Sequence, residues 1–369
     1  MSDFSESRIP GTVEEHQDAT YHFHLSSGGS SSFLAGIGAV MGCHAAGITK
    51  FRSFTGVSAG SIPTALLACG YSSQRLTHLG LKLEFDKHLG LIKELLYIWK
   101  GLGIQNNDKP KCDVDRELRE ARYSGVLATE SLGECMEQLT AESNSSWPTA
   151  FWTMATMRKG HPVVFKGDGV FLLDEHGDWQ QLSDKPVSLV AAVRMSCSIP
   201  IIIASIRYKG MLLYDGALSR DGVCPVGMQI RHLGVEPGKI IACYHGDNHN
   251  EPIYGKLHAL GRLGWGVSAE QRWGPETAGV IDIHPNIQHV HTLKFHLSRD
   301  AKWLAILLAF DACTMRLARE GILRDERLEK VQSLFRDLGA WRSNAPAPPG
   351  SAQMFSARVE SCLSEYGLY

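Results

Sequence analysis

The chain has 369 residues, of which 44% are hydrophobic and 21% charged, and its formal net charge is −2 at pH 7. This length can bury one large α/β core or two smaller ones, and the composition is that of a globular protein. A charge so close to zero excludes a general attraction to nucleic acid or to an anionic membrane, so we expect no nucleic-acid partner. Any contact with lipid requires a local apolar surface.

Residues 1–20 are polar and acidic, and we expect them to form a flexible N-terminal arm. They lack the basic and apolar regions of a secretory signal, and no run in the chain reaches the ~18 apolar residues that span a bilayer. The nine cysteines are odd in number and form no C-x-x-C pair, which indicates reduced thiols rather than disulfides or a zinc site. These features predict a cytoplasmic protein without a metal or other cofactor.

Strands and helices are predicted to alternate after this arm. Alternating Tyr, Phe and Leu predict a strand over 21–26, the loop SGGSSS breaks it, and small apolar residues predict a helix over 33–47. We expect a second strand over 50–56 and a second helix over 61–69. This βαβα order implies a parallel sheet covered by helices.

The remaining elements are predicted from the same signals. Residues 74–143 are expected to be mostly helical, and the apolar stretch 88–103 within them fits either a core helix or a lid that meets lipid. The other predicted elements are, in chain order, strands over 149–156 and 161–167, a helix over 187–200, strands over 211–217 and 239–245, and helices over 255–275 and 298–338. A Pro-rich loop precedes a last short helix.

Residues 56–60 read GVSAG, a G-x-S-x-G pattern between a predicted strand and a predicted helix. In that setting Gly56 and Gly60 leave room for a tight turn, the nucleophile elbow, that presents Ser58 as a nucleophile. The N–H group of Ala59, at the start of the helix, can stabilise a developing oxyanion. The alternative is an ordinary glycine-rich turn, because three fixed positions often occur together without any catalytic role.

A second glycine-rich loop follows the first predicted strand. Gly28, Gly29 and Ser30 lie between that strand and a helix, and neighbouring parallel strands bring their N–H groups beside the elbow. Such a loop can hold an oxyanion or cradle a phosphate. The lack of G-K-[ST] and of G-x-G-x-x-G here favours the oxyanion.

A serine nucleophile also needs a base, and the residues leave two kinds open. An α/β-hydrolase uses a late histidine, and several are available: His245, His284, His289, His291 and His296. The other kind is a carboxylate that acts directly, and Asp215 follows the apolar MLLY and precedes a glycine. An Asx turn explains the same Asp-Gly pair, and Asp221, in a second Asp-Gly pair, is the second choice of base.

These motifs, in this order, resemble the patatin-like phospholipase family. The elbow GVSAG and the DGA at 215–217 are intact, whereas the family's glycine loop GGGx[RK]G reads GGSSSF from Gly28. The likeness covers about residues 21–245. The stretches around the motifs that share it are GAVMGCHAAGI, SIPTALLACGYS, ATMRKGHPVVF and VRMSCSIP.

The resemblance implies a three-layer α/β/α fold with a central, mostly parallel sheet. Residues 21–245 would form the catalytic domain, and residues 246–369 a helical C-terminal extension packed on the same domain. Beyond the N-terminal arm, we therefore expect one domain rather than two.

The resemblance also implies a Ser58–Asp215 catalytic dyad without histidine, working through an acyl-serine intermediate. N–H groups near Gly28, Gly29 and Ser30 would form the oxyanion hole. The implied function is a serine acyl hydrolase that acts on a fatty-acyl ester or another acyl-bearing amphiphile, with peripheral contact to a membrane. Two alternatives stay open: an acyltransferase with the same dyad, and a lipid- or acyl-binding protein without catalysis.

The glycine loop departs from the family pattern at three positions. Ser30 replaces the third glycine, Ser32 the basic residue and Phe33 the closing glycine. A backbone donor survives at Ser30 if its φ is negative. Ser32 cannot replace an Arg or Lys, which weakens the expectation of an anionic phospholipid headgroup.

Overall fold

The computed structural model describes most of the chain from residue 19 onward, with gaps. The described residues are 19–83, 90–91, 127–128, 136–137, 140, 147–148, 151–157, 160–199, 203, 205–219, 222–244, 274–287, 290, 297–338 and 352–369. Nearly all of the expected N-terminal arm and of the expected helix over 255–275 lies outside these residues. Within the apolar stretch 88–103 they include only β3 (Gly90–Leu91), which pairs with β4 (Leu127–Ala128) and is not helical.

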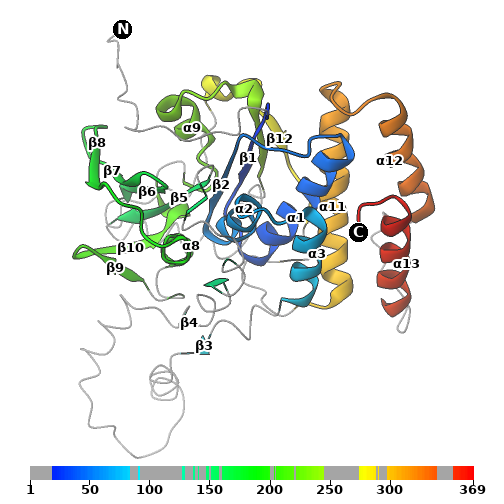
Figure 1. Ribbon diagram of the computed structural model, residues 1–369, viewed down its shortest axis with the longest axis horizontal. Coiled ribbons are helices and arrows are strands. Elements are labelled where there is room, and N and C mark those ends of the chain that lie inside the picture. The colour runs from blue at the N-terminus through cyan, green and yellow to red at the C-terminus, as the bar shows by residue number, and fades with distance from the viewer. Residues whose placement is uncertain are drawn as a thin grey trace, which may run out of the picture.

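A 10-stranded sheet forms the centre of the molecule (Figure 1). Its main path runs β12-β11-β1-β2-β5-β6-β7-β8, with β10 beside β5 and β9 beside β10. The strands are β1 (His22–Leu25), β2 (Ser53–Val57), β5 (Phe151–Met157), β6 (Pro162–Lys166), β7 (Gly169–Leu173), β8 (Trp179–Ser183), β9 (Ile206–Tyr208), β10 (Met211–Asp215), β11 (Ile240–Cys243) and β12 (Ile281–Ile283).

The sheet is parallel from β12 through β11, β1 and β2 to β5. Beyond β5 it is antiparallel, both along the meander from β6 to β8 and at β10. The parallel centre with helices on both faces confirms the predicted three-layer α/β/α fold. The prediction missed β7, β8, β9 and β12, which are short and, in β8, mostly polar.

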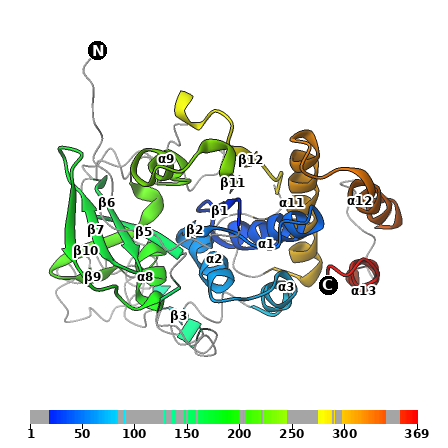
Figure 2. The same cartoon turned by 45° about the horizontal axis from the view of Figure 1, so that its top comes forward.

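Helices cover the two faces unequally, as Figure 2 shows. The largest apolar cluster joins the sheet to the helices of one face, and α9 (Val226–Leu233) packs on smaller clusters at the other. The helices of the first face are α1 (Gly29–Ala45), α2 (Ser61–Ala68), α3 (Ser73–Lys82), α8 (Leu189–Ser196) and α11 (Arg299–Arg319). Two further helices, α12 (Asp325–Leu338) and α13 (Ala352–Glu365), pack against each other, and α13 also contacts α11.

The first helix begins four residues earlier than predicted, at Gly29 instead of Phe33. The Gly/Ser composition of this stretch is typical of a loop, yet the first N–H groups of any helix need no partner inside the helix, so serines can form its first turn. The helical stretch predicted over 298–338 is divided into two helices, because Gly321 takes a left-handed φ of 68° between α11 and α12. No helix in the described ranges has the length and apolar character needed to cross a membrane.

Candidate active site

The GVSAG segment forms a sharp turn from strand to helix at the end of β2. Val57 is extended, Ser58 takes a φ of 53°, and a 3₁₀ turn over Ser58–Gly60 leads into α2. A left-handed serine is strained, and surrounding contacts must hold it. A Cβ on Gly56 would lie 2.3 Å from Gly60 O, and one on Gly60 would lie 2.4 Å from Ser26 O. Gly56 is therefore needed for the turn itself to close, and Gly60 for the turn to pack against the loop after β1.

Strand β5 brings Asp215 beside Ser58, although 157 residues separate them in the chain. Val57, the last residue of β2, pairs with Met154 of β5. The next residue of β5, Ala155, pairs with Asp215, the last residue of β10. Because β2 and β10 end at consecutive positions along β5, the residue after Val57 lies next to Asp215.

The side chains of this pair are in direct contact and almost completely buried. Ser58 Oγ donates a hydrogen bond of 2.6 Å to Asp215 Oδ2, and the two residues are 4% and 2% exposed. Ala217 N–H donates to the other carboxylate oxygen at 2.9 Å, so Asp215 is both an Asx-turn residue and the partner of the serine. Burial raises the pKa of Asp215 to about 7, while the hydrogen bonds from Ser58 and Ala217 oppose the rise.

The C-terminal end of α8 and the residues that follow it hold both members of the pair by their backbones. Ser58 N–H donates to Ser196 Oγ at 2.9 Å, and Asp215 N–H donates to Ser198 O at 2.8 Å. Thr153 Oγ1 lies 3.1 Å from Ser196 Oγ and bridges it to β5. Sequence reasoning missed the role of Ser196, because a hydroxyl that accepts from a distant N–H leaves no local pattern.

The glycine loop lies against the elbow at the start of α1. Gly28 and Gly29 have φ values of 151° and 60°, which favour glycine at both positions. Ser30 is not among the described residues with positive φ, so its replacement of the family's third glycine costs no backbone strain. The α1 helix has no side-chain cap at its N-terminus and contacts the Ser58–Gly60 turn.

The last three residues of the loop motif, Ser31, Ser32 and Phe33, are fully buried. Ser31 Oγ donates to Gly28 O at 2.6 Å, and Ser32 Oγ donates to Ser26 O. Phe33 packs where the glycine of α3, Gly80, leaves space, since a Cβ at Gly80 would lie 3.1 Å from the Phe33 ring. The family's basic position is thus occupied here by an internal hydroxyl that braces the loop.

The histidine alternatives do not gather at Ser58 within the described part of the chain. His284 follows β12 at the sheet edge, and its Nε2 is hydrogen-bonded to Asp282 Oδ2 at 2.8 Å. The four other candidates (His245, His289, His291 and His296), like the second-choice base Asp221, lie outside the described residues. Among the residues that the structure describes, no group of His, Cys, Asp and Glu is arranged to hold a metal.

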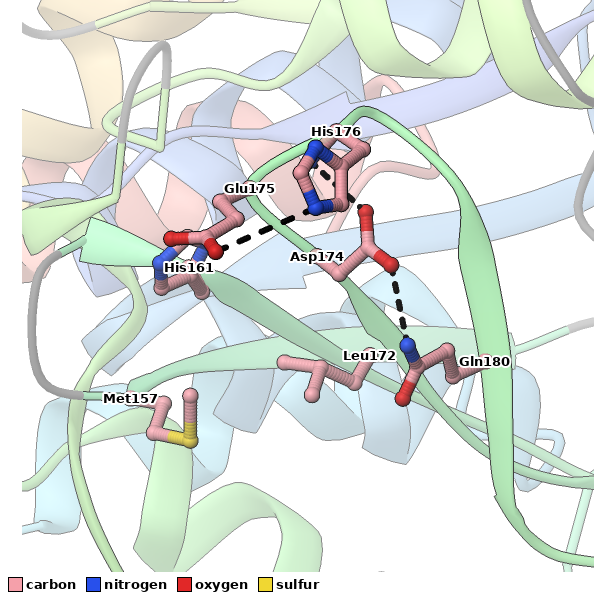
Figure 3. A pocket seen from close by; sticks show the side chains of 7 residues that line it. All are labelled: Met157, His161, Leu172, Asp174, Glu175, His176 and Gln180. Carbon is pink, nitrogen blue, oxygen red and sulfur yellow. Dashed lines mark hydrogen bonds and ion pairs between the residues drawn. The ribbon is translucent and has the colours of Figure 1, made fainter.

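A pocket of about 430 Å³ opens at the antiparallel side of the sheet (Figure 3). Met157 and Leu172 contribute apolar side chains to its wall. Asp174, in the β7–β8 turn, accepts a hydrogen bond from the side chain of Gln180. Neither Ser58 nor Asp215 lines this pocket. It is therefore separate from the candidate active site.

A sequence model of patatin-like phospholipases matches residues 25–226, more than half of the chain. The chain belongs to the patatin-like phospholipase family. The match begins at the end of β1 and ends at the start of α9, so it includes the glycine loop, Ser58 and Asp215. Membership in this family supports lipid acyl hydrolase activity.

The similar proteins are distant. An uncharacterized protein of Acanthamoeba polyphaga mimivirus is 24% identical over 172 residues, which are 45% of this chain and 47% of that protein. This chain thus matches about half the length of that relative. Among solved structures, VipD of Legionella pneumophila has a TM-score of 0.44 at 10% identity, covering 94% of this chain and 80% of VipD. Human GIVD cytosolic phospholipase A2 has a TM-score of 0.41 at 12% identity, covering 84% and 60%.

Proposed function

We propose that this chain is a serine acyl hydrolase that cleaves a fatty-acyl ester of a lipid, with Ser58 as nucleophile and Asp215 as base. The observation that carries the proposal is the hydrogen bond of 2.6 Å from the strained, buried Ser58 to the Asp215 carboxylate. A turn-forming serine without a chemical role needs neither the strain nor a buried carboxylate. Membership in the patatin-like phospholipase family supports the lipid acyl substrate.

The proposed reaction has two halves. Ser58 Oγ attacks the acyl carbonyl carbon while its proton moves to Asp215 Oδ2, and the ester C–O bond then breaks as the leaving alcohol takes up that proton. The acyl group stays on Ser58. Asp215 next takes a proton from water, the resulting hydroxide attacks the acyl-serine, and the proton returns to Ser58 Oγ as the free acid leaves.

N–H groups around the nucleophile are proposed to stabilise the oxyanion that forms in each half. The candidates are Gly28, Gly29 and Ser30 at the uncapped N-terminus of α1 and Ala59 in the elbow turn. Such donors act best in a buried site, where their dipoles are already oriented and little water competes. Removing one donor in comparable enzymes costs about 3 kcal/mol of transition-state stabilisation.

Covalent labelling tests the nucleophile directly. A fluorophosphonate probe should label the wild-type protein at Ser58, leave Ser58→Ala unlabelled and label Asp215→Asn at least about 100-fold more slowly, as for loss of a general base. Asp174→Asn is the matched control, because Asp174 also accepts backbone N–H groups but lies outside the site. A folded wild type that takes up no probe would contradict the proposal and favour a non-catalytic lipid-binding role.

A second measurement separates hydrolysis from acyl transfer. Incubation with mixed lipids and acyl thioesters, followed by mass spectrometry, should show an acyl group on Ser58 and free fatty acid in plain buffer. If the acyl-serine forms but persists until an alcohol, amine or thiol is added, the protein is an acyltransferase with the same dyad.

A further inference from the structure

The catalytic pair lies where two strands run toward each other along one edge of β5 and end. Strand β6 pairs with residues 153–156 of β5 and so occupies the other edge. The parallel strand β2 ends at the pair of Val57 with Met154. The antiparallel strand β10 ends at the pair of Asp215 with Ala155, the next residue of β5. Because both backbone ladders stop at this meeting point, which we call the junction, the residues beyond each strand depend on other hydrogen bonds.

On the Ser58 side of the junction, the hydroxyl of Thr153 holds the end of β2. Thr153 pairs with Gly56, and Thr153 Oγ1 donates to Gly56 O at 2.7 Å. The same oxygen lies 3.1 Å from Ser196 Oγ, which accepts the N–H of Ser58 at 2.9 Å. Since a hydroxyl has one proton and that of Thr153 goes to the carbonyl, Ser196 donates its own proton to Thr153 and presents a lone pair to Ser58. Thr153 thus fixes the backbone two residues before the nucleophile and, through Ser196, at the nucleophile itself.

On the Asp215 side of the junction, the hydroxyl of Thr156 holds the turn that follows β10. Thr156 pairs with Tyr214, and Thr156 Oγ1 donates to Gly216 O at 3.2 Å. A Cβ on Gly216 would lie 2.3 Å from Met154 O, so this turn lies directly against the backbone of β5. The carbonyl that Thr156 holds belongs to the residue after Asp215.

Both threonines are almost completely buried, at 0% exposure for Thr153 and 1% for Thr156. Valine has nearly the shape of threonine but no hydroxyl, so at either position it fills the same space and removes the donor from a carbonyl of the adjoining turn. A buried hydrogen bond that is lost in this way is not readily replaced by water. The turn on that side of the junction is then held less firmly against β5.

We propose that Thr153 and Thr156 are positioning residues, which together hold Ser58 and Asp215 at hydrogen-bonding distance. Their role rests on the proposed function, in which the proton of Ser58 moves to Asp215 across the contact of 2.6 Å. Neither threonine donates to a side chain of the pair: the acceptors are Gly56 O and Gly216 O, both in the backbone. The two hydroxyls therefore act on the separation of the pair and take no part in the proton transfer.

Fluorophosphonate labelling of Ser58 in Thr153→Val and Thr156→Val tests these roles. Each variant should react roughly fivefold more slowly than the wild type, as for the loss of one hydrogen bond. Thr153→Ser and Thr156→Ser keep the hydroxyl and should recover most of the rate. Because the hydrogen bond from Ser58 lowers the pKa of Asp215, separation of the pair should also move the pH midpoint of labelling upward in the valine variants. A loss of stability alone would not move that midpoint.

Thr77→Val is the matched control. Thr77 is 0% exposed and donates to Ser73 O at 2.8 Å within α3. Its replacement should lower the melting temperature about as much as the two junction variants do, yet leave the labelling rate at that of the wild type. Folded junction variants with the wild-type rate and midpoint, or an equal loss of rate in Thr77→Val, would overturn the proposal.

Crystal structures of the wild type and of the two valine variants give a readout that does not depend on activity. The distance from Ser58 Oγ to Asp215 Oδ2 should be longer in each variant than in the wild type, and an unchanged distance in both would overturn the proposal. If the wild type takes up no probe, the proposed function fails while this distance still tests the positioning role. Where a valine variant does not fold, Thr153→Ala or Thr156→Ala replaces it in both measurements.

Discussion

Among single residues, Asp215 has the strongest influence on the proposed chemistry. Its carboxyl group is almost completely buried, and this burial raises its pKa to about 7. Only the ionised form can accept the proton of Ser58. We therefore expect the labelling rate of Ser58 to rise as the pH increases and to level off above about pH 7. Below that value it should fall about tenfold per pH unit, because the ionised fraction falls by that factor.

The rate of fluorophosphonate labelling, measured between about pH 5 and pH 9, checks this expectation. A carboxyl group in water titrates near pH 4, so a midpoint near 4 would show that Asp215 is already charged under acidic conditions. The thermal stability of Ser58→Ala across the same range serves as a control, because it separates titration of the site from acid unfolding.

The hydroxyl of Ser196 is predicted to position the nucleophile without touching the substrate. It accepts the N–H of Ser58 at 2.9 Å and so supports the left-handed backbone there. Ser196→Ala leaves that N–H unpaired, and a hydrogen bond worth about 1 kcal/mol corresponds to roughly fivefold slower labelling. Ser196→Thr, which keeps the hydroxyl, should restore most of the rate.

Ser198→Ala is the matched control in the same segment. Its side chain donates only to Arg194 O within the α8 region, while its backbone carbonyl, which accepts from Asp215 N–H, is retained. Equal losses of labelling in Ser196→Ala and Ser198→Ala would show that the segment acts through general stability alone.

At the scale of the elements, the elbow depends on close contact between two loops. A Cβ on Gly60 would lie 2.4 Å from Ser26 O and 3.0 Å from Leu25 O, both backbone atoms that cannot rotate away. Gly60→Ala should therefore push the elbow from the glycine loop, cost about 1–3 kcal/mol of stability and abolish labelling. Urea unfolding and probe uptake measure the two effects.

Gly238→Ala provides the comparison for this variant. Gly238 lies in an exposed turn, has no positive φ, and a Cβ there would come no nearer than 4.0 Å to another atom. The Gly238→Ala substitution should leave both the stability and the labelling rate unchanged. A Gly60→Ala variant that behaves in the same way would show that the two loops can separate without loss of the site.

The sequence allowed the strand-turn-helix around Ser58 to be predicted because its signals are local: a strand, two glycines and a helix start within a few residues. The neighbour of Ser58 could not be derived from spacing. Asp215 reaches it only through the pairing of β2 and β10 with consecutive residues of β5, which no short pattern records. For the same reason no pattern identifies Ser196, although the stretch VRMSCSIP that contains it shares the family resemblance.

Across the whole molecule, helix α11, which precedes α12 and α13 in the C-terminal part of the chain, packs directly on α1. Helix α1 is the one that starts at the glycine loop. Gly38 and Gly42 of α1 make this possible, since a Cβ on Gly38 would lie 2.1 Å from Ile306 O and one on Gly42 would lie 2.7 Å from Cys313. Trp303 and Phe310 of α11 are fully buried in the same apolar cluster as the sheet. The C-terminal helices thus contribute to the core that supports the site.

We therefore expect the candidate site and the C-terminal helices to unfold in one step. Gly38→Ala should force α11 away from α1 and lower, by the same amount, the urea midpoints measured by circular dichroism, tryptophan fluorescence and Ser58 labelling. Met315→Ala is the control on the same helix, because Met315 is 47% exposed and should leave all three midpoints unchanged. Labelling that persists after most of the helical signal is lost would show that α11 is a separate folding unit. Residues 246–369 would then not form one folding unit with the catalytic domain.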